Sequence, residues 1–267
     1  MIILLIILGV LAGLMAGFFG VGGGLLFSPI LFFLFTSLEV ASPVSWTVGT
    51  ALFCTFIAAS SSTIQQRSHQ NMFWKEGITI GVFGAFGVYL GKLIVTSGYY
   101  TEDVFVSLFV ILLIFVSVMF YRKSQSKVTL QVAPESLNVA KMSGAGGMGG
   151  LVAALAGVGG GIVLVPMMNL LYRLPIVKTV SISSLAIVLI SFSGWVQYAL
   201  FVDSPAGLTD YTLGFVDFGT GFPLIVGAFA GGLLGVKLNK KVSARHVQLG
   251  FSILVIVIAI TMIWSLL

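Results

Sequence analysis

The chain has 267 residues, of which 58% are hydrophobic and only 8% are charged. Ordinary soluble domains are about one quarter charged, so this composition excludes a soluble protein and indicates a polytopic membrane protein. The net charge of +5 is explained by basic cytoplasmic loops and does not indicate a nucleic-acid partner.

The chain divides into two halves with the same order of elements. The first half, residues 1–121, is predicted to contain a helix hairpin at 2–36 and spans at 44–64, 75–97 and 103–121. A polar linker follows at 122–137. The second half, residues 138–267, is predicted to contain a hairpin at 138–172 and spans at 177–201, 212–237 and 243–266. Each span is near the roughly 20 apolar residues that cross a bilayer.

A glycine-rich motif occurs once in each hairpin. It reads Gly20-Val-Gly-Gly-Gly24 in the first half and Gly157-Val-Gly-Gly-Gly161 in the second, and a proline follows each copy at Pro29 and Pro166. Each glycine costs a helix about 1 kcal/mol relative to alanine. The motif therefore predicts a break in each hairpin, and paired breaks in the two halves of a transporter indicate its binding site.

The two halves also match outside this motif, because Gly9 and Gly13 recur at one constant offset as Gly146 and Gly150. Every Lys and Arg except Lys92 falls in loops or helix ends that can face one side of the membrane. Basic residues mark the cytoplasmic side. This arrangement works only if one hairpin begins outside and the other inside, which predicts two inverted repeats with both termini on the outer side.

The glycine breaks have a functional and a structural interpretation. In the functional one, backbone amides at the start of each half-helix attract an anion. In the structural one, the glycines only allow close helix crossing, although that explains a repeated triple glycine poorly. A nucleotide-binding loop is disfavoured because the preceding strand and the lysine are missing.

Hydroxyl residues cluster on the span that follows each hairpin. They are Thr47, Thr50, Ser60, Ser61, Ser62 and Thr63 in the first half, and Ser181, Ser183, Ser184, Ser191 and Ser193 in the second. Most are expected to bond helix carbonyls. Thr50, Ser183 and Ser184 are candidate anion ligands because they recur at similar depth.

Three further polar residues have two interpretations each. Gln65 and Gln197 end these spans, where they line a path or mark the membrane interface. Asp217 is a candidate for proton coupling because intramembrane carboxylates are usually functional. Its place near a helix start equally fits charge matching with the helix dipole.

The sequence offers no metal-ligand spacing and no nucleophile–base pair, so we expect no enzyme activity, no metal and no cofactor. The expected partners are a small anionic substrate and the lipid bilayer, with a second copy of the chain as a candidate. A non-transporting scaffold or sensor is the alternative to a transporter.

With its two glycine motifs, Val48-Gly-Thr50 and Ser183-Ser184, the chain resembles the sulfite exporter TauE/SafE family over nearly its whole length. The resemblance implies a transporter of sulfite, sulfoacetate or other small organic anions in the bacterial inner membrane, with periplasmic termini. The family often has a histidine at the end of the third helix, where this sequence has Gln65-Gln66-Arg67. The expected substrate-binding positions are Gly20, Gly22, Gly23, Gly24, Pro29, Thr50, Gln65, Gly157, Gly159, Gly160, Gly161, Pro166, Ser183, Ser184 and Gln197.

Overall fold

The computed structural model describes residues 1–19, 24–67, 73–125, 137–239 and 244–264, and nearly every element in these ranges is a helix. The first half contains α1 (Ile2–Phe19), α2 (Gly24–Ser37), α3 (Pro43–Arg67), α4 (Trp74–Val95) and α5 (Glu102–Gln125). The second half contains α6 (Val139–Ala156), α7 (Gly161–Pro166), the π-helical turn η1 (Met167–Leu171), α8 (Ile176–Leu200), α9 (Phe218–Asn239) and α10 (Ala244–Trp264).

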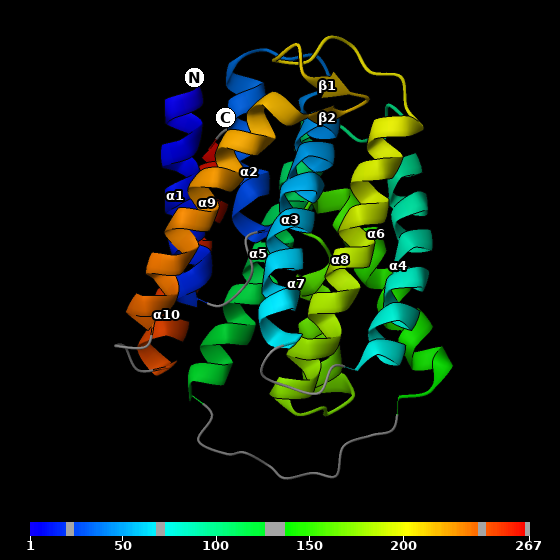
Figure 1. Ribbon diagram of the computed structural model, residues 1–267, viewed down its shortest axis with the longest axis vertical. Helices are drawn as coiled ribbons and strands as arrows, with labels where there is room; N and C mark the ends of the chain where they lie inside the picture. The colour runs from blue at the N-terminus through cyan, green and yellow to red at the C-terminus, as the bar shows by residue number, and fades with distance from the viewer. Residues whose placement is uncertain (20–23, 68–72, 126–136, 240–243, 265–267) are drawn as a thin grey trace.

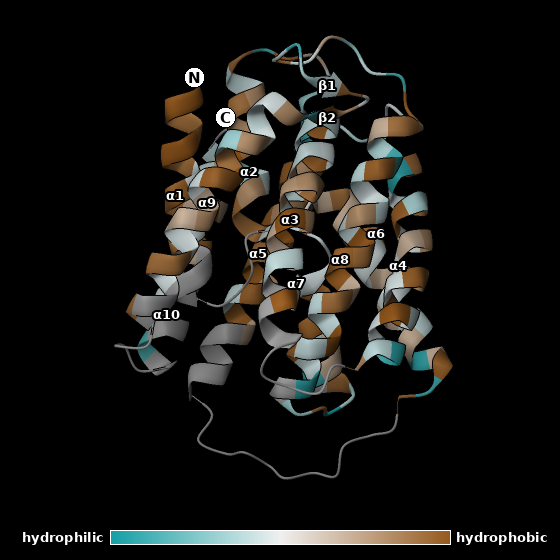
Figure 2. Ribbon diagram, viewed as in Figure 1, coloured by the Kyte–Doolittle hydropathy of each residue, from teal (hydrophilic) through white to brown (hydrophobic). Residues whose placement is uncertain are grey.

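The outer surface of the helices is apolar, as a lipid-facing surface must be. Large apolar side chains point outward, including Ile3 at 74% and Phe86 at 62% exposure. Figure 2 shows hydrophobic residues along the helices, with hydrophilic residues gathered at their two ends. Among the described residues, 6 helices are long and apolar enough to cross a membrane. The predicted all-α, multi-pass membrane fold is confirmed.

The helices pack in pairs that join the two halves of the chain. α1 packs against α9, α6 against α4, α3 against α8, and α5 against α10. In Figure 1, α1 runs down from the N-terminus, α6 runs up, and both termini lie at the upper end. By their order in each half, α1, α3, α4 and α5 correspond to α6, α8, α9 and α10. Exchanging each helix for its counterpart leaves this set of pairs unchanged.

Glycine makes the two outer pairs possible, because their backbones touch. A methyl group added to Gly13 would overlap the backbone of Ala228, and one added to Gly150 would overlap Gly84. Small residues allow such close approach in membranes, where dispersion and weak hydrogen bonds replace the hydrophobic effect.

Further contacts of the same kind follow the same correspondence. Gly9 faces the carbonyl oxygen of Leu224, and its counterpart Gly146 faces that of Ile80. The α1–α9 contact is therefore repeated by α6 and α4, residue for residue, at these positions.

The span predicted at 212–237 begins later than expected. We predicted a helix from residue 212, but residues 212–217 form an antiparallel hairpin of β1 (Thr212–Leu213) and β2 (Val216–Asp217). Gly214 has a φ of 51°, a left-handed conformation that suits the turn between the strands and not a helix. Helix α9 accordingly starts at Phe218.

Candidate functional site

The second glycine motif forms a sharp bend between two helices. α6 ends at Ala156, the amide of its C-cap Gly157 donates to the carbonyl oxygen of Ala153 at 2.8 Å, and α7 begins at Gly161. Gly157, Gly159 and Gly160 have φ values of 72°, 68° and 77°. Only glycine adopts this left-handed conformation without steric cost. The motif is thus required by the backbone path of the bend.

The first glycine motif meets this bend. Gly20, Gly22 and Gly23 lie outside the described residues, but Gly24 begins α2. A methyl group on Gly24 would lie 2.9 Å from the carbonyl oxygen of Val158, at the middle of the second motif. Gly24, the last residue of the first motif, therefore lies beside the second motif inside the bundle, although the two are far apart in the sequence.

Three buried hydroxyl groups surround the place where the motifs meet. A methyl group on Gly157 would lie 2.7 Å from Ser28 Oγ, one on Gly24 would lie 2.9 Å from Thr55 Oγ1, and one on Gly159 would lie 2.9 Å from Ser191 Oγ. Ser28 and Ser191 are fully buried and Thr55 is 4% exposed. Hydroxyls need a partner in an apolar interior, because burial without one costs about 1–3 kcal/mol.

None of these three hydroxyls has a hydrogen-bond partner among the described residues. Buried polar groups without partners are rare in folded proteins and require an explanation. A ligand that accepts hydrogen bonds at the bends would supply the missing partners. We call Ser28, Thr55 and Ser191 the hydroxyl triad.

The sequence pointed to only part of this triad. Ser191 belongs to the hydroxyl cluster of the second half, but Ser28 and Thr55 were not singled out. Ser28 does lie between the first glycine motif and Pro29, at the position where the second half has Val165. That difference between the two halves is the signal that would have found it.

The other motif residues take structural places around the bends. Pro29 lies buried inside α2, and Gly161 faces the side chain of Ile187. Pro166 ends α7 and precedes the π-helical turn η1. Its missing amide hydrogen explains a local change of hydrogen-bond pattern.

Thr50 and Asp217 are hydrogen-bonded to each other and not to the hydroxyl triad. The Asp217 amide donates to Thr50 Oγ1 at 3.1 Å. The Asp217 carboxylate accepts from the Thr209 amide and hydroxyl at 3.1 and 2.6 Å and from the Thr220 amide at 3.0 Å. The bond from Thr220, three residues ahead, is the geometry of a helix N-cap. Asp217 thus caps α9, one of its two predicted roles.

The remaining predicted ligands contact helix backbone. The hydroxyls of Ser183 and Ser184 donate to the carbonyl oxygen of Val180 at 3.2 and 2.8 Å. Gln197 Nε2 donates to the carbonyl oxygen of Ala85 at 3.3 Å, while its Oε1 is buried without a partner. Gln65 lies in α3, and its side chain is outside the described part of the structure.

Buried charge is scarce in the ranges that the structure describes. The buried charged side chains there are Lys92 and Asp217. Lys92 Nζ lies over the rings of Tyr89 and Phe201, 5.3 and 5.5 Å from their centroids. No group of three His, Cys, Asp or Glu residues that could hold a metal occurs among the described residues. The chemistry at the bends is therefore that of neutral donors.

Comparison with known proteins agrees with this membrane architecture. The sequence profile of the family described as "Sulfite exporter TauE/SafE" matches residues 5–262. A probable membrane transporter protein of Methanocaldococcus jannaschii is 30% identical over 93% of this chain and 90% of its own length. Probable membrane transporter proteins of Bacillus subtilis and Haemophilus influenzae are each 26% identical over 98% of this chain and 97% of their own lengths. No solved structure matches the chain.

Proposed function

The chain belongs to the sulfite exporter TauE/SafE family, and from this premise we propose that it is a secondary transporter that holds a small anion between its two glycine bends. The substrate is sulfite, sulfoacetate or another organosulfonate, and the direction is export. The family description and the names of the curated relatives support a membrane transporter.

The hydroxyl triad is the observation that carries the proposal. Ser28, Thr55 and Ser191 come from three different helices and leave three buried donors without partners at one place. Hydroxyls donate to the oxygens of an anion without requiring a fixed positive charge. A neutral site suits a transporter, because a substrate bound by permanent ion pairs is released slowly.

An inverted-repeat architecture would provide alternating access. The matching contacts of Gly13 with Ala228 and of Gly150 with Gly84 support this architecture, as do the opposite directions of α1 and α6 (Figure 1). In transporters built from such repeats, one bundle moves against the other around a fixed central site. The triad lies where the two halves meet, which is where such a site is expected.

We place the protein in the bacterial inner membrane with both termini in the periplasm. Lys75, Lys141 and Lys178 lie in the first turns of α4, α6 and α8. These turns are at the lower end of the molecule in Figure 1, opposite the termini. Basic residues concentrate on the cytoplasmic side, which supports this orientation.

A flux assay in proteoliposomes tests the proposal. Purified protein is reconstituted, and the uptake of labelled sulfite and sulfoacetate is compared with that of chloride and of an uncharged solute. The proposal expects saturable movement of at least one sulfur oxyanion that protein-free liposomes do not show. Equal permeability to all solutes, or no movement of any anion, would overturn it.

A further inference from the structure

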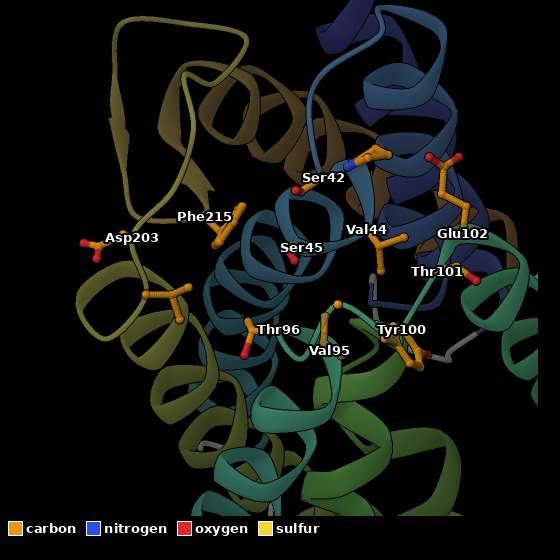
Figure 3. A pocket seen from close by; sticks show the side chains of 13 residues that line it. Ser42, Val44, Ser45, Val95, Thr96, Tyr100, Thr101, Glu102, Asp203 and Phe215 are labelled. Carbon is orange, nitrogen blue, oxygen red and sulfur yellow. The ribbon is translucent and has the colours of Figure 1, made fainter.

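The described part of the protein has a cavity at the end where the termini lie. Its volume is about 460 Å³. Its walls are the first turn of α3, the end of α4, the start of α5 and the segment that joins α8 to α9, as Figure 3 shows. Its lining is mixed: apolar side chains such as Phe215 alternate with the hydroxyls of Ser45, Thr96 and Thr101 and with the carboxylates of Glu102 and Asp203. A cavity that opens at one end of a membrane bundle is accessible to water-soluble molecules.

Tyr100 lies between this cavity and the glycine bends. It lines the cavity but is only 8% exposed, and its hydroxyl donates to the carbonyl oxygen of Leu155 at 2.9 Å. Burial raises the pKa of Tyr100 still further above physiological pH, where a tyrosine hydroxyl is in any case protonated and able to donate. A second tyrosine, Tyr198, donates to the neighbouring carbonyl oxygen of Ala154 at 3.2 Å. Two tyrosines therefore hold the end of α6.

The end of α6 leads directly to the triad. Leu155 precedes Gly157 by two residues, and Gly157 lies against Ser28 and Ala51. The cavity, Tyr100, the last turn of α6 and the bend thus form a continuous series of contacts. The contact between Tyr100 and Leu155 separates the cavity from the triad in this series.

We propose that the cavity is the outer vestibule of the transport path and that Tyr100 is its closed gate. This inference rests on the proposed function. Opening requires the hydroxyl of Tyr100 to release the Leu155 carbonyl and the ring to swing into the vestibule. The ring is carried by the loop of residues 96–101, which joins α4 to α5 and contains Gly98 with a left-handed φ of 77°.

Thiol labelling tests the gate without requiring any substrate. The native cysteine is removed by Cys54→Ala, and single cysteines are introduced by Thr101→Cys in the vestibule, where the side chain is exposed, or by Ser28→Cys at the bend. Thr96→Cys and Thr55→Cys are second reporters at the same two places. A membrane-impermeant methanethiosulfonate is added outside proteoliposomes, and the labelling rate is measured with and without Tyr100→Phe.

The vestibule reporter is expected to label quickly and at the same rate with either residue at position 100. The bend reporter is expected to label slowly, and Tyr100→Phe should accelerate it about two- to tenfold, the change that one neutral hydrogen bond produces. Tyr99→Phe is the matched control, because Tyr99 is 89% exposed, and it should change neither rate.

Two results would overturn the proposal that Tyr100 is a gate. One is a bend reporter whose labelling rate is the same with Tyr100 and with Phe at that position. The other is an equal acceleration of both reporters, which would indicate general loosening of the fold. Because labelling needs no anion, a failed gate can be distinguished from a failed transport function, which the flux assay reports.

Discussion

Ser117 of α5 and Ser252 of α10 donate to each other's backbone carbonyl oxygens, and both distances are 3.3 Å. The two bonds link the helices at one crossing point from both sides. The two serines are buried and lie in the last long helix of each half. They add a reciprocal contact to the α5–α10 pair, which joins the two halves of the chain.

The glycine contacts between the halves should be sensitive to a single methyl group. Gly150→Ala places a methyl group against the backbone of Gly84, so it should lower the free energy of unfolding by about 1–3 kcal/mol. Gly147→Ala is the matched control, because its added methyl group meets nothing within 4 Å. It should leave stability unchanged or raise it by up to about 1 kcal/mol. Unfolding in a denaturing detergent measures both, and equal effects would contradict the close contact.

The hydroxyl triad should matter for binding and not for folding. Thr55→Val keeps the shape of the side chain and removes a hydroxyl that has no partner among the described residues. A hydrogen bond to a charged ligand contributes about 1.5–3 kcal/mol, so the Kd for the anion should rise about 10- to 150-fold. Thermal stability without anion should stay the same or increase.

Thr63→Val is the control for this substitution. Thr63 lies further along α3, and its hydroxyl is also buried without a partner. Thr63→Val should leave the Kd for the anion unchanged. Calorimetry on the two purified variants gives their Kd values, and an equal loss of affinity in both would argue against anion binding by the hydroxyl triad.

The bend should tolerate no side chain at Gly159. Gly159→Ala places a methyl group 2.9 Å from Ser191 Oγ and against Thr55, so it should abolish the thermal shift produced by the anion. The left-handed backbone adds a cost of about 1–2 kcal/mol. Gly98→Ala shares this backbone cost, since Gly98 has a φ of 77°, but its methyl group meets nothing within 4 Å. It should lower stability and retain the shift; loss of the shift in both would mean that strain alone disrupts binding.

Much of the fold follows from simple features of the sequence. Apolar runs of about 20 residues mark the long helices, and the repeated triple glycine marks the bend that the structure describes at Gly157. The hairpin at 212–217 was missed because its strands have two residues each. Strands that short carry no alternating pattern, and their apolar residues extend the pattern of the helix that follows.

The site was harder to predict, because it depends on contacts between distant segments. Ser28 and Thr55 are isolated hydroxyls on apolar helices, and nothing in their spacing distinguishes them from residues that bond helix carbonyls. Ser183 and Ser184 recur like a motif but bond within α8. Other hydroxyls, such as that of Thr63, are also buried without a partner among the described residues. What distinguishes Ser28, Thr55 and Ser191 is that α2, α3 and α8 bring them together at the bend.

Asp217 should behave as a helix cap. Asp217→Ala removes the acceptor for Thr209 and Thr220, so it should lower the free energy of unfolding by about 1–2 kcal/mol. Asp217→Asn keeps an acceptor and should cost less. If Asp217→Asn instead abolished the dependence of anion flux on a pH gradient while stability stayed normal, proton coupling would be its main role.

The most direct test of the anion site is the triple variant Ser28→Ala, Thr55→Val, Ser191→Ala, measured by labelled sulfite flux in proteoliposomes beside the unmodified protein. The account predicts that the triple variant folds with the same or a higher Tm and loses at least about tenfold in flux, because its donors at the bends are gone. Flux at the unmodified rate in a folded triple variant would contradict it and would place the anion elsewhere in the protein.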